Sequence, residues 1–269
     1  MKTTPYFSLA STFSNSLSCS KLKNNLLRFL SAVILFFSFV GGSWGQVSVS
    51  ATSGTTGPTA YTTVSAAFTA INTGTHQGII TINITGNTTE PTSPTALLKS
   101  SSPSNYSAVT IKPSGGNFSI NGTATANYGI INLRGADNVT IDGDDPSTSG
   151  VRNLTIQFTA TATTNHTAVI RISSNSTTGL DGANNNTVKN CILIGSRTTT
   201  GTNNIHGINF SDNNTGSLNM TSSGGASSIN NIIENNLITR VVTGIWANGL
   251  SGYALSGLQI KNNVFGDGT

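Results

Sequence analysis

The chain has 269 residues, of which only 8% are charged, with 13 basic and 9 acidic side chains and a formal net charge of +4. Four of the basic residues precede position 46, inside the export signal described next, so the remainder carries 9 basic against 9 acidic residues and gives no support for nucleic-acid or anionic-membrane binding. Of the two cysteines only Cys191 follows position 46, which excludes an internal disulfide scaffold from that part of the chain.

Residues 1–45 have the composition of a signal peptide. Lys21, Lys23 and Arg28 lie shortly before the apolar run FLSAVILFFSFV (29–40), and small residues, among them Ser43 and Gly45, follow it. The run is shorter than the ~20 residues that a membrane-spanning helix needs. We therefore expect cleavage before Gln46, a secreted or cell-surface protein, and no membrane span after cleavage.

Residues 46–105 are expected to form an N-terminal cap and the first coils of a β-structure. One helical face is predicted from the spacing of Val64, Ala67, Phe68 and Ile71. A short amphipathic helix of this kind can cover the exposed apolar end of a stacked core. Isoleucines that alternate over residues 79–84 then predict a strand, and SAVTIKP (107–113) predicts another.

A short pattern recurs within residues 106–269, and we expect it to form stacked strands. Each copy has an apolar residue, two mostly polar residues, a corner residue, and a second apolar residue two positions later. The first apolar positions are Ile141, Val188, Ile233 and Ile260, the corner positions are Asp144, Cys191, Asn236 and Asn263, and the later apolar positions are Leu193, Ile238 and Phe265. NLTIQF (153–158) repeats the start of the unit. Such recurrence is typical of a solenoid.

A second strand type recurs between copies of the first. Its first apolar residues, Ile130, Val169, Ile208 and Ile245, are separated by 39, 39 and 37 residues. Because the repeats continue to the last residues with nothing to cover the final coil, we expect the chain to be the C-terminally truncated part of a longer protein.

Asparagine pairs interrupt these apolar segments, as in NNIIENNLITRVVTGIWANG (230–249). Asparagine is a poor helix former that tolerates left-handed backbone angles, so the pattern predicts very short strands separated by tight corners. Asn236 and Asn263 at equivalent corners are expected to form a ladder of side-chain amides. Cys191 holds the same position in its repeat, which predicts a buried, unreactive thiol.

These repeats resemble the right-handed parallel β-helix of the pectin-lyase-like superfamily. The resemblance implies an all-β fold, a right-handed parallel β-helix solenoid with a short N-terminal capping helix. The region from VSVSATSGTTGPTAYTT (47–63) onward is similar to the N-terminal part of large secreted surface proteins of Bacteroidetes-type bacteria. That similarity implies further C-terminal modules in the full-length protein.

The superfamily includes polysaccharide lyases and glycoside hydrolases, and the latter need two carboxyl groups across the scissile bond. The acidic residues cluster only at Asp142, Asp144 and Asp145. DGDD resembles the paired aspartates of polygalacturonases superficially, because the Gly-His-Gly and Arg-Ile-Lys elements of that family are absent. The three aspartates are weak candidate ligands for Ca²⁺, and turn formation at a corner is the favoured role. No catalytic or cofactor-binding residue is assigned.

Other polar and aromatic residues suggest surfaces instead of catalytic sites. Arg134, Arg152, Arg171 and Arg240 are candidates for one polar face of the stack. Trp246 and Tyr253 are candidates for a carbohydrate-stacking surface, although an aromatic residue in a strand such as TGIWA is more often part of the core.

Two functions therefore stay open at this stage. The favoured one is a secreted, non-catalytic stalk or adhesin-like binding module that faces a polysaccharide or cell-surface glycan. The alternative is a carbohydrate-active enzyme, a polysaccharide lyase or glycoside hydrolase, with its site largely outside this chain. Fold alone does not separate them, because this scaffold supports both.

Overall fold

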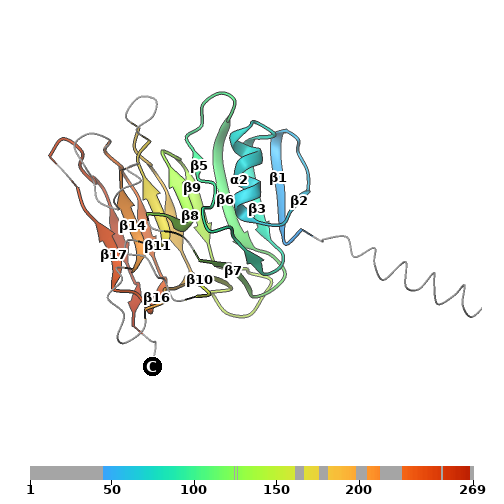
Figure 1. Ribbon diagram of the computed structural model, residues 1–269. Coiled ribbons are helices and arrows are strands. Elements are labelled where there is room, and N and C mark those ends of the chain that lie inside the picture. The colour runs from blue at the N-terminus through green and yellow to red at the C-terminus, as the bar shows by residue number, and fades with distance from the viewer. Residues whose placement is uncertain are drawn as a thin grey trace, which may run out of the picture. The chain divides into compact units, whose positions relative to one another are not determined.

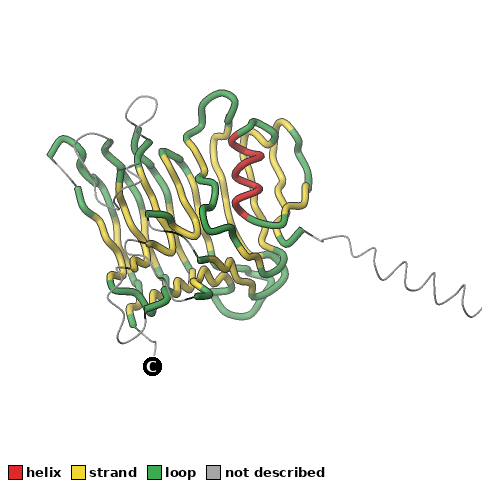
Figure 2. Tube along the Cα trace, viewed as in Figure 1, coloured by secondary structure: helices red, strands yellow, loops and turns green. Residues whose placement is uncertain are grey.

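The computed structural model describes residues 45–123, 125, 127–160, 167–175, 181–197, 205–212, 226–249 and 251–266. The predicted signal peptide lies, apart from Gly45, outside the described residues. The described chain consists of three largely parallel sheets and one helix (Figures 1 and 2). No helix within these ranges combines the length and the apolar character needed to cross a membrane.

An antiparallel strand begins the first sheet. β1 (Val47–Gly54) pairs antiparallel with β2 (Thr59–Tyr61) on one side and with β3 (His76–Ile84) on the other. β1 was not predicted, although Val47 and Val49 alternate with polar residues and are fully buried. The end of the stack is therefore closed by antiparallel strands as well as by a helix.

The predicted N-terminal helix is confirmed as α2 (Val64–Asn72), whose buried apolar residues are Val64, Ala67, Phe68 and Ile71. The Thr63 hydroxyl caps its first turn by accepting the Ala66 N–H at 3.0 Å. The buried Glu90 carboxylate accepts the N–H groups of Val64 and Ser65 at 3.0 and 2.9 Å. A carboxylate at this end also complements the helix dipole, so Glu90 fixes α2 to the first coil.

Beyond the cap, successive strands pass in turn through three sheets, and we call one such passage a coil. Sheet A has the order β18-β15-β12-β9-β6-β3-β1-β2, sheet B the order β19-β16-β13-β10-β7-β4, and sheet C the order β17-β14-β11-β8-β5. Every pairing between coils is parallel, which is consistent with a β-helix.

Six coils follow one another from the cap toward β17 in Figure 1. Coil 1 contains β3, β4 (Thr88–Thr89) and β5 (Leu97–Leu98); coil 2 contains β6 (Tyr106–Pro113), β7 (Phe118–Gly122) and β8 (Gly129–Arg134); coil 3 contains β9 (Val139–Asp142), β10 (Leu154–Phe158) and β11 (Thr167–Ser173). Coil 4 contains β12 (Thr187–Lys189), β13 (Cys191–Ile194) and β14 (Ile205–Ser211); coil 5 contains β15 (Ile232–Glu234), β16 (Leu237–Thr239) and β17 (Thr243–Ala247); coil 6 contains β18 (Gln259–Lys261) and β19 (Val264–Phe265).

The core consists of apolar rows in which the same register position recurs from coil to coil. In sheet A the predicted row of Ile141, Val188, Ile233 and Ile260 is confirmed by the strand register. In sheet B the predicted row of Leu193, Ile238 and Phe265 is confirmed in the same way. Each coil removes the apolar surface of the previous one from water, which is the main stabilising contribution in a stack of this kind.

In the second strand type, the predicted pairing of Val169 with Ile208 is wrong by one residue. Ile208 of β14 pairs with Ile170 of β11 instead of Val169. Ile170 also pairs with Ile131 of β8, and Ile208 pairs with Ile245 of β17. The sequence contains adjacent apolar residues at 169 and 170, so spacing alone did not indicate which one faces the core.

NLTIQF was also assigned to the wrong strand type. Its residues form β10 in sheet B, where Leu154 pairs with Cys191, and not a copy of the sheet A strand. Eleven residues separate β9 from β10, whereas a single residue separates β12 from β13. Because of this longer corner, Leu154 and not Asp144 occupies the position equivalent to Cys191.

Asparagine in the left-handed conformation forms most of the tight corners, as the sequence predicts. Asn138, Asn185 and Asn230 precede sheet A strands with φ of 58°, 57° and 57°, and Asn190, Asn235 and Asn262 separate sheets A and B with φ of 58°, 54° and 54°. A residue with a Cβ is strained there unless its side chain is short and can bond locally. Each of these corners therefore needs an asparagine for backbone geometry, and Asn185, Asn230, Asn235 and Asn262 are each the first of an asparagine pair.

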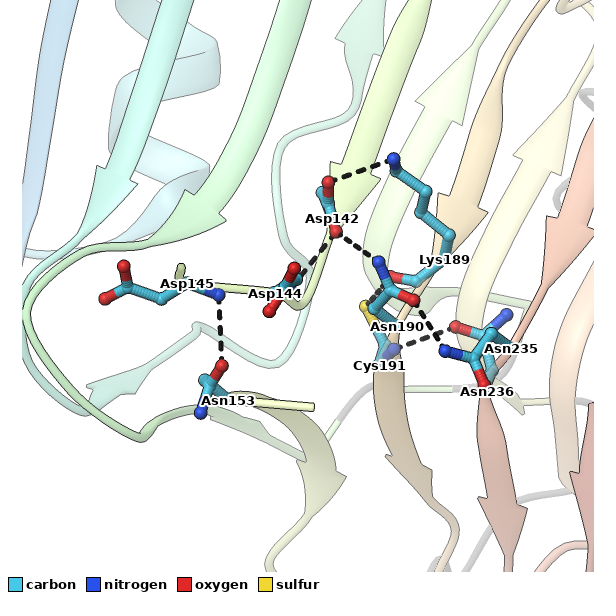
Figure 3. A network of polar contacts seen from close by, with 9 residues as sticks. All are labelled: Asp142, Asp144, Asp145, Asn153, Lys189, Asn190, Cys191, Asn235 and Asn236. Carbon is cyan, nitrogen blue, oxygen red and sulfur yellow. Dashed lines mark hydrogen bonds and ion pairs between the residues drawn. The ribbon is translucent and has the colours of Figure 1, made fainter. Parts of the chain in front are cut away.

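Between sheets A and B the second asparagine of the pair, Asn236 or Asn263, forms the predicted ladder. Asn236 is fully buried, its Oδ1 accepts the Cys191 N–H at 3.0 Å, and its Nδ2 donates to the Val188 carbonyl at 2.9 Å (Figure 3). Asn263 continues the ladder through its Oδ1, which accepts the Asn236 side-chain amide at 2.9 Å. The backbone groups at this corner are thus paired by side chains where no strand partner exists.

A second ladder, which sequence analysis missed, runs along the corner between sheets C and A. Asn186 Oδ1 accepts the Val139 N–H at 2.9 Å, and Asn231 Oδ1 accepts the Asn186 N–H at 3.0 Å. Both side chains are at most 1% exposed. The signal for it was present in the sequence, since each residue follows another asparagine directly before a sheet A strand.

Candidate functional site

A cavity of about 290 Å³ lies against the outer face of sheet C. Its floor is formed by Asn132 and Arg134 of β8 and by Arg171 and Ser173 of β11. These residues alternate with the core residues of the same strands, such as Leu133, so their side chains leave the sheet on the side away from the core. The volume lies at the lower limit of the ~300–1,000 Å³ that is usual for small-molecule sites, so it suits one small group.

The wall of the cavity is formed by residues 93–98, which α2 holds in place. Asn72, at the end of the helix, donates to the Ala96 carbonyl at 2.8 Å and accepts the Leu98 N–H at 3.0 Å. The Thr95 N–H donates to Ser65 Oγ at 2.8 Å. The N-terminal cap therefore does more than cover the core, because it also positions one side of the site.

Arg171 is the most enclosed charged residue of the floor. Its Nε donates to Ser211 Oγ at 3.0 Å, its Nη1 to the Asn127 carbonyl at 2.5 Å, and its Nη2 to the Asp212 carbonyl at 2.7 Å. Burial lowers the pKa of Arg171 to about 10, the Asp212 charge opposes that shift, and the Arg134 charge adds to it. The guanidinium stays charged at neutral pH but is held rigidly by these contacts.

The electrostatic character of the cavity is cationic. Arg134 and Arg171 both line it, and none of the described residues that line it carries a carboxylate. Tyr128 contributes an aromatic ring to the same lining, and Ser93 and Ser173 contribute hydroxyl groups. Planar guanidinium groups favour carboxylate, sulfate or phosphate oxygens, so the arrangement favours a small anionic group.

The three candidate calcium ligands lie elsewhere, at the corner between β9 and β10. Asp142 accepts Lys189 Nζ at 3.1 Å and Asn190 Nδ2 at 2.8 Å, and one of its oxygens also accepts the Asp144 N–H at 3.1 Å. In Figure 3 the carboxylates of Asp142 and Asp145 point away from each other. Within the described part of the chain no group of three or more His, Cys, Asp or Glu side chains is placed to hold a metal ion.

The Asp145 carboxylate links the corner between β9 and β10 to the corner between β6 and β7. Its carboxylate accepts the hydroxyl and N–H of Ser147 at 2.7 and 3.0 Å and the N–H of Gly115 at 2.6 Å. These hydrogen bonds, with the Ser147 hydroxyl contributing most, hold the pKa of Asp145 well below its usual range. The contacts describe an aspartate that stabilises a turn and links it to the corner of coil 2.

The four arginines proposed for one polar face do not share one face. Only Arg134 and Arg171 come together, in the cavity. Arg152 instead bonds the main-chain and side-chain oxygens of Asn235, both at 2.9 Å, and Arg240 is an exposed corner residue with φ of 52°. Sequence spacing did not reveal that Arg134 and Arg171 line one cavity, which depends on the stacking of β8 and β11.

The sequence favoured a core position for the aromatic residue of the strand TGIWA, and the structure does not place it there. Trp246 belongs to the outer face of sheet C, where it is 37% exposed and lies 5.6 Å from the His206 ring between centroids. Asn209 of the neighbouring β14 pairs with Trp246 and is fully buried, so the cavity and Trp246 are separate parts of this face. Tyr253 is half-buried between β17 and β18.

Cys191 is confirmed as a buried thiol. It is 0% exposed, and its Sγ donates to the Lys189 carbonyl at 3.1 Å. Burial raises the pKa of the Cys191 thiol well above its usual range, which suppresses the reactive thiolate.

Comparison of the chain with protein-family models, with curated proteins and with solved structures found no match in any of the three.

Proposed function

We propose that this protein is an exported, non-catalytic binding module built on a right-handed parallel β-helix of the pectin-lyase-like kind. In this proposal it serves as a rigid stalk or adhesin-like part of a larger surface protein, similar to those of Bacteroidetes-type bacteria. The parallel passage of the strands through three sheets supports the fold, since it is the arrangement that such a solenoid requires.

The ligand that we propose for the cavity over sheet C is an acidic group of a polysaccharide or cell-surface glycan. The observation that carries this proposal is the presence of Arg134 and Arg171 together in a cavity whose described lining residues include no carboxylate. Hydroxyl, amide and aromatic groups in the same lining suit the hydroxyl groups and the apolar ring face of a sugar.

Calorimetric titration of the purified protein with acidic and neutral oligosaccharides of equal length tests the proposal. We expect binding of the acidic series alone. Arg134→Gln should weaken it about tenfold or more, because a hydrogen bond to a charged group contributes roughly 1.5–3 kcal/mol. Arg197→Gln removes the same charge from an exposed position away from the cavity lining and should leave the affinity unchanged.

Two results would contradict the proposed ligand. One is equal affinity for acidic and neutral oligosaccharides, and the other is unchanged affinity in Arg134→Gln.

Export is tested separately by N-terminal sequencing of protein recovered outside the cell, where we expect Gln46 as the first residue. Recovery of a chain that begins at Met1 would contradict the export.

A further inference from the structure

The cavity over sheet C is bounded on both sides along the axis of the stack. On the side of the cap, residues 93–98 form its wall, and the pairing of β5 with β8 places Leu98 beside Arg134. On the other side, Asn209 and Ser211 of β14 continue the two rows of floor residues, and they are 0% and 1% exposed. A ligand needs accessible surface to lie on, so a glycan chain cannot continue from the cavity over β14.

Arg171 strengthens this boundary because it spans the step from the cavity to coil 4. Its Nε donates to Ser211 Oγ at 3.0 Å, and its Nη2 donates to the Asp212 carbonyl at 2.7 Å. Asp212 is also 0% exposed. A guanidinium group that lines the cavity is therefore bonded to covered residues of the next coil, which makes this side of the cavity rigid as well as closed.

The wall is joined to the rest of the stack at both of its ends. At the end where β8 begins, the Thr125 N–H donates to the Thr92 carbonyl at 2.9 Å, and the Ser93 and Thr125 hydroxyl groups lie 3.4 Å apart. At the other end, Lys99 Nζ forms an ion pair with Asp181 at 3.0 Å. These contacts bound the cavity in the direction of the strands, so its mouth faces outward from sheet C.

The shape and the volume of the cavity together determine which part of a glycan fits. An internal residue of a polysaccharide has a neighbouring sugar on each side, so a site for it needs an exit at two ends. A cavity of about 290 Å³ with closed sides accepts a small group that enters from one direction. The end of a chain meets this condition, because only one neighbouring sugar has to stay outside.

We propose that the cavity binds the terminal acidic sugar of a glycan chain and excludes the same sugar inside a chain. This inference rests on the acidic-glycan ligand proposed above and restricts that ligand to one position. Surface glycans are attached to protein or lipid through their reducing end, so the terminus that is free to enter is the non-reducing one. Arg134 and Arg171 bind the acidic group, and the Tyr128 ring in the same lining contacts the sugar ring.

Two isomeric trisaccharides, each made of one glucuronic acid and two glucose residues, test the restriction. In one isomer the glucuronic acid is at the non-reducing end, and in the other it lies between the glucose residues. In calorimetric titration of the purified protein, the terminal isomer should bind about tenfold more tightly or better, because the closed sides exclude a sugar with two neighbours. A trisaccharide of glucose alone is the neutral control and should bind more weakly than the terminal isomer.

Two variants place this preference in the cavity. Arg134→Gln should reduce the affinity for the terminal isomer to about that for the internal isomer, because the acidic group loses a charged partner. Arg197→Gln removes the same charge from an exposed position outside the cavity lining and should leave both affinities unchanged.

A second measurement compares short and long oligogalacturonides. Each chain has one non-reducing end, so end recognition predicts one protein per chain and the same affinity per chain at every length. Internal recognition predicts instead that the affinity and the number of proteins per chain increase with the number of equivalent sugars.

The results separate this inference from the proposal on which it rests. Equal or tighter binding of the internal isomer, or an affinity that rises in proportion to chain length, would overturn end recognition while leaving an acidic ligand in place. A preference for the terminal isomer that Arg134→Gln leaves unchanged would also overturn it, because recognition would then lie outside the cavity. Equal affinity for the acidic and neutral trisaccharides, or binding of none of them, would overturn both proposals.

Discussion

Asn236 illustrates how a single buried amide can stabilise a stack with few charges. Its side chain bonds the backbone of coil 4 and the side chain of Asn263, so both its donor and its acceptor group are used. A buried polar group is tolerated only when it is paired in this way. Replacing it therefore affects three coils at once.

Asn236→Leu should lower the free energy of unfolding by about 1–3 kcal/mol, because it leaves the Cys191 N–H and the Val188 carbonyl without their partner. Urea denaturation measures the loss. Asn83→Leu makes the same chemical change on the half-buried outer side of β3 and should alter stability by no more than about 0.5 kcal/mol. Equal losses in the two variants would contradict the structural role of the ladder.

Asp145 is a second single residue that stabilises the fold, in this case through the charge of its carboxylate. Its folded-state pKa lies below the usual 3.8, chiefly because of the Ser147 hydrogen bonds and the Gly115 N–H. An acid with a depressed folded pKa contributes stability that is fully present above its unfolded pKa and is lost as pH falls through the folded value.

The pH dependence of Asp145→Asn tests this contribution. The stability difference between the original protein and the variant should be constant at neutral pH and should shrink as the pH is lowered below about 3.8. Denaturation curves at a series of pH values provide the measurement. A difference that stays constant down to the acid limit would show that the charge of Asp145 contributes nothing.

At the scale of the element, the corners depend on backbone conformation as much as on side chains. Asn235 has φ of 54°, its side chain donates to Asn190 Oδ1 at 2.8 Å, and it accepts from Arg152. Each strand of sheets A and B in coils 4 to 6 has no more than four residues, so these corners occur at close intervals along the chain. Their geometry determines how each strand enters the next sheet.

Asn235→Ala and Asn235→Gly separate the backbone contribution from that of the side chain. Both variants lose the contacts with Asn190 and Arg152, but glycine adopts a positive φ without the steric cost that alanine meets. We expect Asn235→Ala to be less stable than Asn235→Gly by about 1 kcal/mol in thermal or urea unfolding. Equal stability, or greater stability of the alanine variant, would mean that the left-handed corner is not maintained in solution.

At the scale of the whole molecule, the arginines of the cavity and the aspartates after β9 lie in different parts of the stack. Among the described residues, those that line the cavity over sheet C include two arginines and no carboxylate. At the acidic corner after β9 the carboxylates of Asp142 and Asp145 bond to lysine, asparagine, serine and main-chain groups. Glycoside hydrolysis needs an acid and a second carboxylate at one place, and eliminative cleavage needs a base next to a charge-neutralising group. The described residues do not bring such a set together at the cavity.

The proposed non-catalytic function predicts that the purified protein does not cleave acidic glycans. We expect neither new reducing ends nor unsaturated, ultraviolet-absorbing products after incubation with pectin or alginate, in the presence or absence of Ca²⁺. Products that form and then disappear in Asp144→Ala would contradict this expectation and would place catalysis at the corner after β9.

The sequence by itself determined the repeating unit, the face of α2 and the use of asparagine at the corners. These are local properties, since a row such as Val188, Ile233 and Ile260 follows from a fixed count of residues between an apolar position and its corner.

Only the tertiary structure decided the features that depend on corner length. The eleven residues before β10 displaced Asp144 from the ladder, and adjacent apolar residues at 169 and 170 left the register of β11 open. Arg134 and Arg171 meet because β8 and β11 stack in parallel, and the cavity exists because α2 holds residues 93–98 beside them. Sequence spacing does not encode such contacts, because they form between segments whose separation varies with every corner.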